Sequence, residues 1–272
     1  MYKYLFFLFA FVYSLSASQT KVIEVPSKSM NKSVQVSMVI PDSYDSSGKK
    51  YPVVYLLHGY GNNHTNWPKF VTKLVDQYDI LAVCPDGARD SWYFDSPKRE
   101  DYRYETFFCK ELIPYIDGNY RTEANRQKRA IAGASMGGHG ALYLAMRNKE
   151  LFGAVAGMSG GLDIRPFHRK YKISTHLGPI AKSKELFEEH TCINNIKHIK
   201  NGDLAINIDC GTEDFFIDVN RSFAAELKKQ GIEHNYEERK GAHGWKFWRE
   251  SIVIHMKFFN EFFNAETLKK SE

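Results

Sequence analysis

The chain has 272 residues, of which 43% are hydrophobic and 25% are charged, and its formal net charge is +5. This is ordinary globular composition, and the length suits one large α/β domain or two small ones. Basic residues are mixed with acids, as in Lys182-Ser183-Lys184-Glu185, so the chain lacks the basic block that would indicate a nucleic-acid partner.

The N-terminal segment has the three parts of a secretory signal peptide. Lys3 supplies a positive charge, residues 4–13 form an apolar run, and residues 14–18 are mostly small and polar. We expect cleavage after Ser18, a secreted or periplasmic protein, and a single mature domain over residues 19–272. The apolar run is too short for a stable membrane span, and no other segment approaches one.

The remaining sequence begins with strands and then alternates strands with helices. Alternating polar and apolar residues predict half-exposed antiparallel strands over 21–25 and 33–40. Unbroken apolar runs predict strands that are buried on both faces, and a further segment is expected to form an edge strand. The buried runs are 52–57, 80–84, 129–132, 154–158 and 204–208, and the edge strand is 234–239.

Helix-length segments separate these strands, at residues 102–115, 137–148, 219–230 and 245–263. The alternation implies an α/β fold with a mostly parallel sheet and helices on both faces. Ligands of such sheets bind beyond the carboxyl ends of the strands. Residues 162–200 are charged and irregular, and we expect them to form an excursion or lid over that edge.

The cysteines show no metal-binding spacing such as C-x-x-C, and we expect no metal site. Export would permit disulfides. Cys84 and Cys210 end apolar runs and are expected to be buried, whereas Cys109 and Cys192 could pair. Three connectivities are possible, and the spacing does not choose among them.

Residues 133–137 read Gly-Ala-Ser-Met-Gly, between a predicted strand and a predicted helix. This is the setting of a G-x-S-x-G nucleophile elbow, in which a sharp turn exposes the serine at the edge of the sheet. The flanking glycines allow the chain to pass close to the serine without a Cβ clash. We therefore predict that Ser135 is a nucleophile.

A serine hydroxyl needs a base, and the base needs an orienting acid. In α/β-hydrolases the chain order is serine, acid, histidine. Asp214, in the loop after the predicted strand 204–208, is the expected acid, with Glu213 as the alternative. His243 lies between glycines before the last helix and is the expected base.

The oxyanion hole needs two backbone N–H donors. One is expected from Met136, the residue after the nucleophile. The other is expected from the loop after the strand 52–57, at Tyr60, with Gly59 or Gly61 as alternatives. His58, at the end of that strand, is interpreted as a structural residue.

With these residues placed, the chain resembles the putative-esterase family of α/β-hydrolases. That family includes tributyrin esterases, the feruloyl and acetyl-xylan esterases of carbohydrate esterase family one, S-formylglutathione hydrolases and mycolyltransferases. The resemblance spans about residues 33–260 and is carried by motifs in the family's order. They are Tyr55-Leu56-Leu57-His58-Gly59 with Trp67, Pro85-Asp86-Gly87, Ser91-Trp92-Tyr93, Asp95-Ser96-Pro97, Glu111-Leu112-Ile113-Pro114-Tyr115-Ile116, Tyr120-Arg121-Thr122, Gly133-Ala134-Ser135-Met136-Gly137-Gly138, Gly211-Thr212-Glu213-Asp214 and His243-Gly244-Trp245.

The resemblance implies a secreted serine carboxylester hydrolase that acts on short-chain acyl, acetyl or cinnamoyl esters, including those of plant polysaccharide. It also implies the triad Ser135, Asp214 and His243, the Tyr60 and Met136 amides, and substrate contacts from Trp92 and Trp245. No cofactor is implied, and the oligomeric state stays open. Acyl transfer to a sugar or lipid acceptor would use the same triad, and a carbohydrate-binding protein without catalysis is a third interpretation.

Overall fold

The computed structural model describes residues 18–269, so the expected signal peptide lies almost wholly outside the described residues. The described chain forms an eight-stranded sheet in the order β1-β2-β4-β3-β5-β6-β7-β8. The pair β1–β2 and the pair β2–β4 are antiparallel, and the other neighbours are parallel. The strands are β1 Gln19–Ser27, β2 Lys32–Ile40, β3 Val53–Leu57, β4 Leu81–Pro85, β5 Arg129–Ala134, β6 Ala154–Met158, β7 Ala205–Gly211 and β8 Asn235–Arg239.

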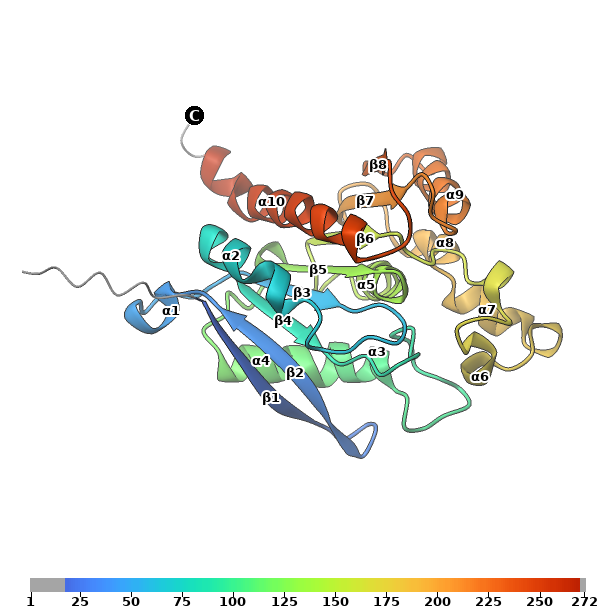
Figure 1. The fold of residues 1–272 in the computed structure, drawn as a ribbon, viewed down its shortest axis with the longest axis horizontal. Helices are drawn as coiled ribbons and strands as arrows, with labels where there is room; N and C mark the ends of the chain where they lie inside the picture. The colour runs from blue at the N-terminus through green and yellow to red at the C-terminus, as the bar shows by residue number, and fades with distance from the viewer. Residues whose placement is uncertain (1–17, 270–272) are drawn as a thin grey trace, which may run out of the picture.

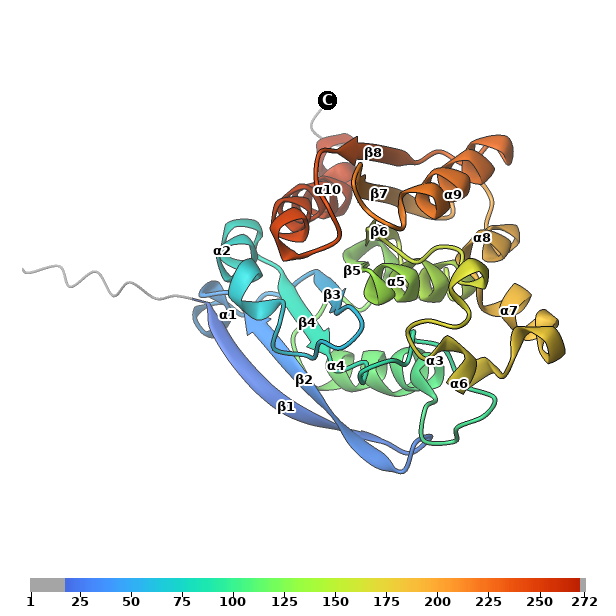
Figure 2. The same ribbon diagram turned by 45° about the vertical axis from the view of Figure 1, so that its right-hand side comes forward.

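Helices cover both faces of the sheet, and Figures 1 and 2 show the three layers. On one face lie α2 (Pro68–Tyr78) and α10 (Trp245–Lys269), which contact each other. On the other face lie α5 (Met136–Arg147), α9 (Ile217–Lys229) and the helix made of α3 (Tyr104–Thr106), η1 (Phe107–Leu112) and α4 (Ile113–Asn119). The predicted α/β-hydrolase fold, with antiparallel strands first, is confirmed.

The central strands are apolar on both sides because both sides are covered. Successive residues point to opposite faces, so Val54 and Leu56 pack with α2 and α10, whereas Val53, Tyr55 and Leu57 pack on the other side. On the α10 face, β5 and β6 present mainly alanines, namely Ala130, Ala132, Ala134, Ala154 and Ala156. Small side chains there leave room for the aromatic residues of α10.

The helix predicted over 102–115 instead runs from Tyr104 to Asn119 and contains a wide π turn, in which Ile113 N–H donates to Phe108 O. Pro114 follows immediately, and a proline has no N–H for a regular helical bond. The wider turn lets the chain continue through this position. The predicted helices 219–230 and 245–263 correspond to α9 and α10, and α10 is longer than expected.

Residues 162–200 form short helices that lie beyond the ends of the central strands, on the right in Figure 1. Buried apolar side chains, including Ile173, Phe187 and Ile196, attach this excursion to the main core. Its elements are η3 Arg165–Phe167, α6 Ile173–Leu177, η4 Ile180–Lys182, α7 Lys184–His190, α8 Cys192–Asn195 and η5 Ile196–His198. The remaining short helices of the described chain are α1 Ser43–Ser46 and η2 Arg126–Lys128.

All four cysteines are unpaired and buried. The pairing of Cys109 with Cys192, which the sequence left open, is not formed: Cys109 lies in η1, and Cys192 begins α8, where its Sγ is 3.3 Å from the carbonyl oxygen of His139. No helix of the described residues has the length and apolar character that a membrane crossing requires.

Buried histidines join the excursion to α5. His139 is fully buried, with its Nδ1 3.1 Å from Trp92 O and its Nε2 2.9 Å from His190 O. Tyr143 stacks between His139 and His190, at ring distances of 5.5 and 6.0 Å. Burial lowers the pKa of His139 to about 4 and also lowers the pKa values of His176 and His190. These side chains therefore stay neutral in the folded protein at neutral pH.

We expect the fold to lose stability as the pH falls from 7 to 5. The folded pKa values of His139, His176 and His190 are lowered. The contribution of each to stability is fully present above the unfolded pKa of about 6.5 and is lost as the pH falls toward the folded pKa. Urea unfolding at several pH values measures the loss, which for His139 alone should reach about 1.4 kcal/mol per pH unit. The variant His139→Gln should have a shallower dependence, and an unchanged slope would contradict the prediction.

Candidate active site

Ser135 lies in a sharp turn between β5 and α5. Its backbone has φ 59° and ψ −116°, a conformation that side-chain-bearing residues seldom adopt and that is often found at functional sites. Two close approaches of backbone to backbone make the turn possible. A Cβ on Gly133 would lie 2.2 Å from Gly137 O, and a Cβ on Gly137 would lie 2.3 Å from Leu57 O. Any larger residue at either position would push the turn away from β3.

The structure brings Ser135, His243 and Asp214 together. His243 Nε2 is 2.9 Å from Ser135 Oγ, and His243 Nδ1 is 2.8 Å from Asp214 Oδ2 and 3.0 Å from Oδ1. In this arrangement the Nδ1–H donates to the carboxylate and Nε2 accepts the serine proton. The Asp214 side chain is fully buried, and its Oδ1 also accepts the Phe216 N–H at 2.8 Å.

Asp214 rather than Glu213 reaches the histidine because of how two loops meet. The Glu213 N–H donates to Gly241 O at 2.9 Å, and the Thr212 N–H donates to Arg239 O at 2.9 Å. These bonds hold the β7–α9 loop against the β8–α10 loop. The hydrogen bonds of His243 Nδ1 go to Asp214, whereas Glu213 lines the cavity of about 790 Å³ that also borders His243. The alternative acid is therefore not in the relay.

The backbone beside Ser135 supplies candidates for the oxyanion hole. Gly59 approaches the nucleophile so closely that a Cβ there would lie 3.3 Å from Ser135 Cβ. The Gly61 N–H is occupied, since it donates to Arg89 O at 2.8 Å. In the described part of the chain, the N–H groups of Tyr60 and Met136 donate to no protein acceptor. This favours Tyr60 over Gly61, and the role of both amides stays a prediction.

His58 is buried beside this loop, as its structural interpretation required. The Gly87 N–H donates to His58 Nε2 at 2.8 Å, and His58 Nδ1 lies 2.9 Å from Gly59 O. The neutral imidazole accepts at one nitrogen and donates at the other. It thereby ties the loop after β4 to the loop that carries Tyr60.

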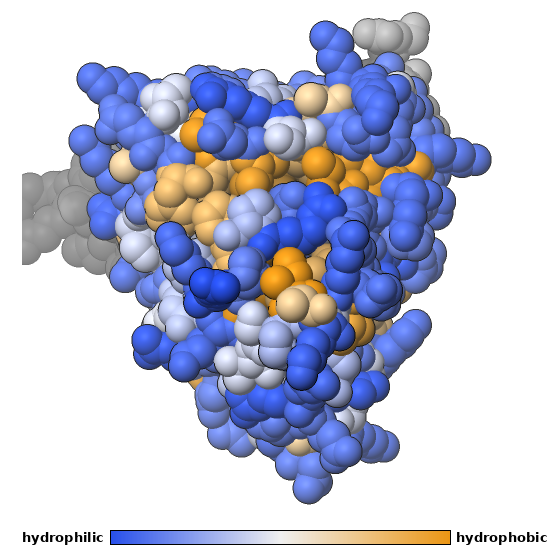
Figure 3. Space-filling view, turned by 90° about the vertical axis from the view of Figure 1, so that its right-hand side faces the viewer, coloured by the Kyte–Doolittle hydropathy of each residue, from blue (hydrophilic) through white to orange (hydrophobic). Residues whose placement is uncertain are grey.

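Aromatic side chains line the approach to the triad. Phe215 follows the acid, is 51% exposed, and has its ring 4.2 Å from the His243 ring. Tyr171, from the excursion, stacks on Phe215 at 6.2 Å and meets Tyr60 edge-on at 5.6 Å. We call Phe215, Tyr171 and Tyr60 the aromatic row. Figure 3 faces the side where the excursion lies and shows apolar side chains in a band across a mostly hydrophilic surface.

Sequence reasoning missed Phe215 and Tyr171. The pair Phe215-Phe216 directly after the expected acid was a usable signal, because it places large aromatic side chains next to a residue of the predicted triad. No local signal pointed to Tyr171, which reaches the site only because the excursion folds back over it.

The two expected tryptophans have different positions. Trp92 is 1% exposed, and its Nε1–H donates to Tyr171 O at 3.1 Å. The buried indole therefore contacts the aromatic row and has no exposed face that could bind a ligand. Trp245 is half-buried and packs on Trp67 at 5.0 Å. Together with His243, Trp245 lines a cavity of about 790 Å³ between the β8–α10 loop and the start of α10.

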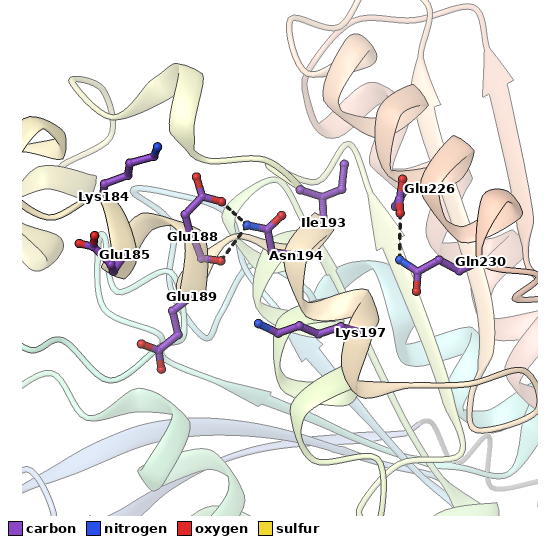
Figure 4. Close-up of a pocket in the computed structure, with 9 residues that line it drawn as sticks. All are labelled: Lys184, Glu185, Glu188, Glu189, Ile193, Asn194, Lys197, Glu226 and Gln230. Carbon is purple, nitrogen blue, oxygen red and sulfur yellow. Dashed lines mark hydrogen bonds between the residues drawn. The ribbon is translucent and has the colours of Figure 1, made fainter.

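A second cavity, of about 720 Å³, lies between α7, α8 and α9 (Figure 4). Two pairs of its polar residues bind each other: Asn194 Nδ2 donates to Glu188 O at 3.1 Å, and Gln230 Nε2 donates to Glu226 Oε1 at 2.9 Å. None of its lining residues belongs to the triad. We assign it no part in the chemistry.

The chain matches the family described as Putative esterase over residues 27–259. It is 27% identical to the Acetyl esterase of Caldicellulosiruptor saccharolyticus, over 84% of this chain and 92% of the relative. It is 34% identical to the Endo-1,4-beta-xylanase/feruloyl esterase of Xylanibacter ruminicola, over 50% of this chain and 20% of that protein. A solved ferulic acid esterase has a TM-score of 0.78 at 29% identity, over 91% of this chain and 99% of the other.

The family match covers most of the described fold, and the elbow and the strands β2 to β8 lie within it. The resemblance read from the motifs is thereby confirmed. The chain belongs to the Putative esterase family of α/β-hydrolases and is a carboxylic ester hydrolase.

Proposed function

We propose that the protein is an exported serine esterase that cleaves its substrate through an acyl-enzyme on Ser135. The observation that carries the proposal is the relay from Ser135 Oγ through His243 to Asp214, with heavy-atom distances of 2.9 and 2.8 Å. Distances of this size allow proton transfer without rearrangement. The buried carboxylate keeps Nδ1 protonated and stabilises the imidazolium that forms.

The reaction has two halves with the same proton path. His243 Nε2 takes the Ser135 proton while Oγ attacks the ester carbonyl, and the Tyr60 and Met136 amides donate to the oxyanion. When the tetrahedral intermediate collapses, the C–O bond to the alcohol breaks and His243 returns the proton to that oxygen. A water molecule then repeats the sequence on the acyl-enzyme, which releases the acid and restores the serine.

The aromatic row favours a substrate with an aromatic acyl group over a substrate with an acetyl group. Phe215, Tyr171 and Tyr60 follow one another from the histidine to the oxyanion loop, and half of the Phe215 side chain is open to solvent. A planar cinnamoyl group can stack on such rings, whereas an acetyl group is too small to reach them. The relative from X. ruminicola, named as both xylanase and feruloyl esterase, supports a feruloyl ester of a plant polysaccharide.

The alcohol side of the substrate must lie near His243 Nε2, because that atom protonates the leaving oxygen. The 790 Å³ cavity adjoins His243 on the α10 side and presents the half-buried indole of Trp245. Indole faces are suitable surfaces for the apolar faces of sugar rings. We therefore extend the proposal to a sugar bound beside Trp245.

Export is supported by the fit between the expected cleavage point and the fold. β1 begins at Gln19, the residue after the expected cleavage site, so removal of residues 1–18 leaves every residue of β1 in place. N-terminal sequencing of protein secreted by the cell is expected to give Gln19 as the first residue. Retention of Met1 on the exported protein would contradict the prediction.

Replacing the nucleophile tests the mechanism. Ser135→Ala is expected to lower kcat for p-nitrophenyl butyrate by about 10³-fold or more, because no other group can form the acyl-enzyme. An organophosphonate should label the wild-type protein at Ser135 and leave the variant unlabelled. Ser37→Ala, at a buried serine of β2, is the matched control and should keep wild-type activity. Activity retained in Ser135→Ala would refute the mechanism.

Replacing Phe215 tests the choice of acyl group. Phe215→Ala should lower kcat/KM for methyl ferulate by about 5- to 30-fold, the equivalent of roughly 1–2 kcal/mol of ring stacking and burial. The value for p-nitrophenyl acetate should stay within about twofold, since acetyl does not reach the ring. Phe215→Leu keeps apolar bulk without the ring, and its kcat/KM for methyl ferulate should lie between the values of the wild type and of Phe215→Ala. An equal loss of kcat/KM on both esters would mean that Phe215 positions His243 and does not bind the acyl group.

A further inference from the structure

A buried ionic cluster lies behind the triad and takes no direct part in the proposed relay. Asp209 is 2% exposed, and its Oδ1 is 3.2 Å from His255 Nε2. The guanidinium of Arg239 forms an ion pair with Asp209 Oδ2 and donates to Ser251 Oγ at 2.7 Å. We call Asp209, Arg239, Ser251 and His255 the Asp209 cluster.

The members of the Asp209 cluster come from the three elements that hold the acid and the base. Asp209 is in β7, which leads directly into the loop of Asp214. Arg239 is the last residue of β8, which leads into the loop of His243. Ser251 and His255 are on α10, which begins just after His243. The cluster therefore joins β7, which precedes the loop of Asp214, to β8 and α10, which flank the loop of His243.

The buried charge of Asp209 is compensated by partners on β8 and α10, whereas the partly exposed Arg239 guanidinium also pairs with Glu237 at 3.7 Å and with Glu250 at 3.5 Å. Burial raises the pKa of the Asp209 carboxyl, but His255, Ser251 and Arg239 outweigh that effect and hold the pKa below its usual value. An unpaired buried carboxylate or guanidinium would be strongly unfavourable. Any sliding of β8 or α10 relative to β7 would separate these partners, so the cluster penalises misalignment.

Backbone contacts transmit this alignment to the loops. The Arg239 carbonyl accepts the Thr212 N–H at 2.9 Å, and the Gly241 carbonyl accepts the Glu213 N–H at 2.9 Å. The Arg239 guanidinium also lies over the Phe247 ring, 4.4 Å from its centroid, in the first turn of α10. Arg239 thus contacts, through its main chain or side chain, the acid loop and the helix that follows His243.

We propose that Asp209 and Arg239 are positioning residues for the esterase reaction, which set the Asp214 carboxylate and the His243 imidazole at their reactive separation. The inference rests on the proposed function of the triad. It assigns a functional reason to a buried ion pair that apolar side chains could otherwise replace without loss of stability. Neither residue touches the substrate or the reacting atoms.

The test compares Asp209→Asn with Asp117→Asn. Asp117 pairs with Arg129 at 2.6 Å, and Arg129 begins β5 at the end opposite the elbow, so this pair is a matched control remote from the site. Asp209→Asn should lower kcat by about 10- to 100-fold with KM within twofold, because ground-state binding does not need the relay. Asp117→Asn should leave both constants unchanged. Equal kcat values for the two variants, both folded by circular dichroism, would overturn the proposal.

A second variant and a spectroscopic signal keep the test decisive if Asp209→Asn folds poorly. Arg239→Lys retains the charge without the guanidinium fork, and should recover part of the kcat that Arg239→Met loses. The low-field proton NMR resonance of the His243 Nδ1–H bonded to Asp214 should be present in Asp117→Asn and be lost or shifted in Arg239→Met. A resonance unchanged in Arg239→Met would overturn the proposal. Ser135→Ala distinguishes a failure of the proposed mechanism from a failure of this inference. If Ser135→Ala retains activity, the mechanism is refuted, and the His243 resonance alone then tests whether Arg239 positions His243 and Asp214.

Discussion

The site depends on one steric constraint: at the elbow, main-chain atoms are in direct contact at two positions where only glycine fits. Gly133 and Gly137 lie so close to each other and to Leu57 O that no Cβ fits at either position. Because the turn is this tight, Ser135 is held at φ 59°, its hydroxyl stands at the end of β5, and the Met136 N–H begins α5 beside it. The hydroxyl, the amide and the loop after β3 thus meet in one place before any substrate arrives.

The second half of the site is assembled by elements distant in sequence. Asp214 and His243 follow the neighbouring strands β7 and β8, whose parallel pairing brings their carboxyl ends to one edge. The loops then need only two backbone hydrogen bonds to bring the carboxylate to the imidazole. In this arrangement the sheet supplies coarse placement, and the buried Asp209 cluster is well placed to supply the fine adjustment that a proton relay requires.

The surroundings of the triad are less regular than the triad itself. The excursion supplies Tyr171 and is attached to α5 by a stack of neutral histidines around Tyr143. Trp92 connects these histidines to the aromatic row, because its carbonyl lies 3.1 Å from His139 Nδ1 and its Nε1–H donates to Tyr171 O. Stability at low pH and the placement of Tyr171 are therefore connected through one group of contacts.

Periodicity and motif order were enough to predict the α/β-hydrolase fold, the elbow, and three residues that the structure brings together, Ser135, Asp214 and His243. Strand, turn and helix are local patterns, and the sheet restricts the chain order of the three residues. The predictions from unbroken apolar runs matched β3 to β7 closely, because such runs are typical of strands that are covered on both faces, and the alternating pattern of β2 and the expected edge strand β8 also matched. Only the tertiary structure separated Asp214 from Glu213, buried Trp92, left the cysteines unpaired and placed Tyr171 at the site. Those outcomes depend on which side chains meet after the chain has folded, and spacing along the sequence carries no information about contacts between loops.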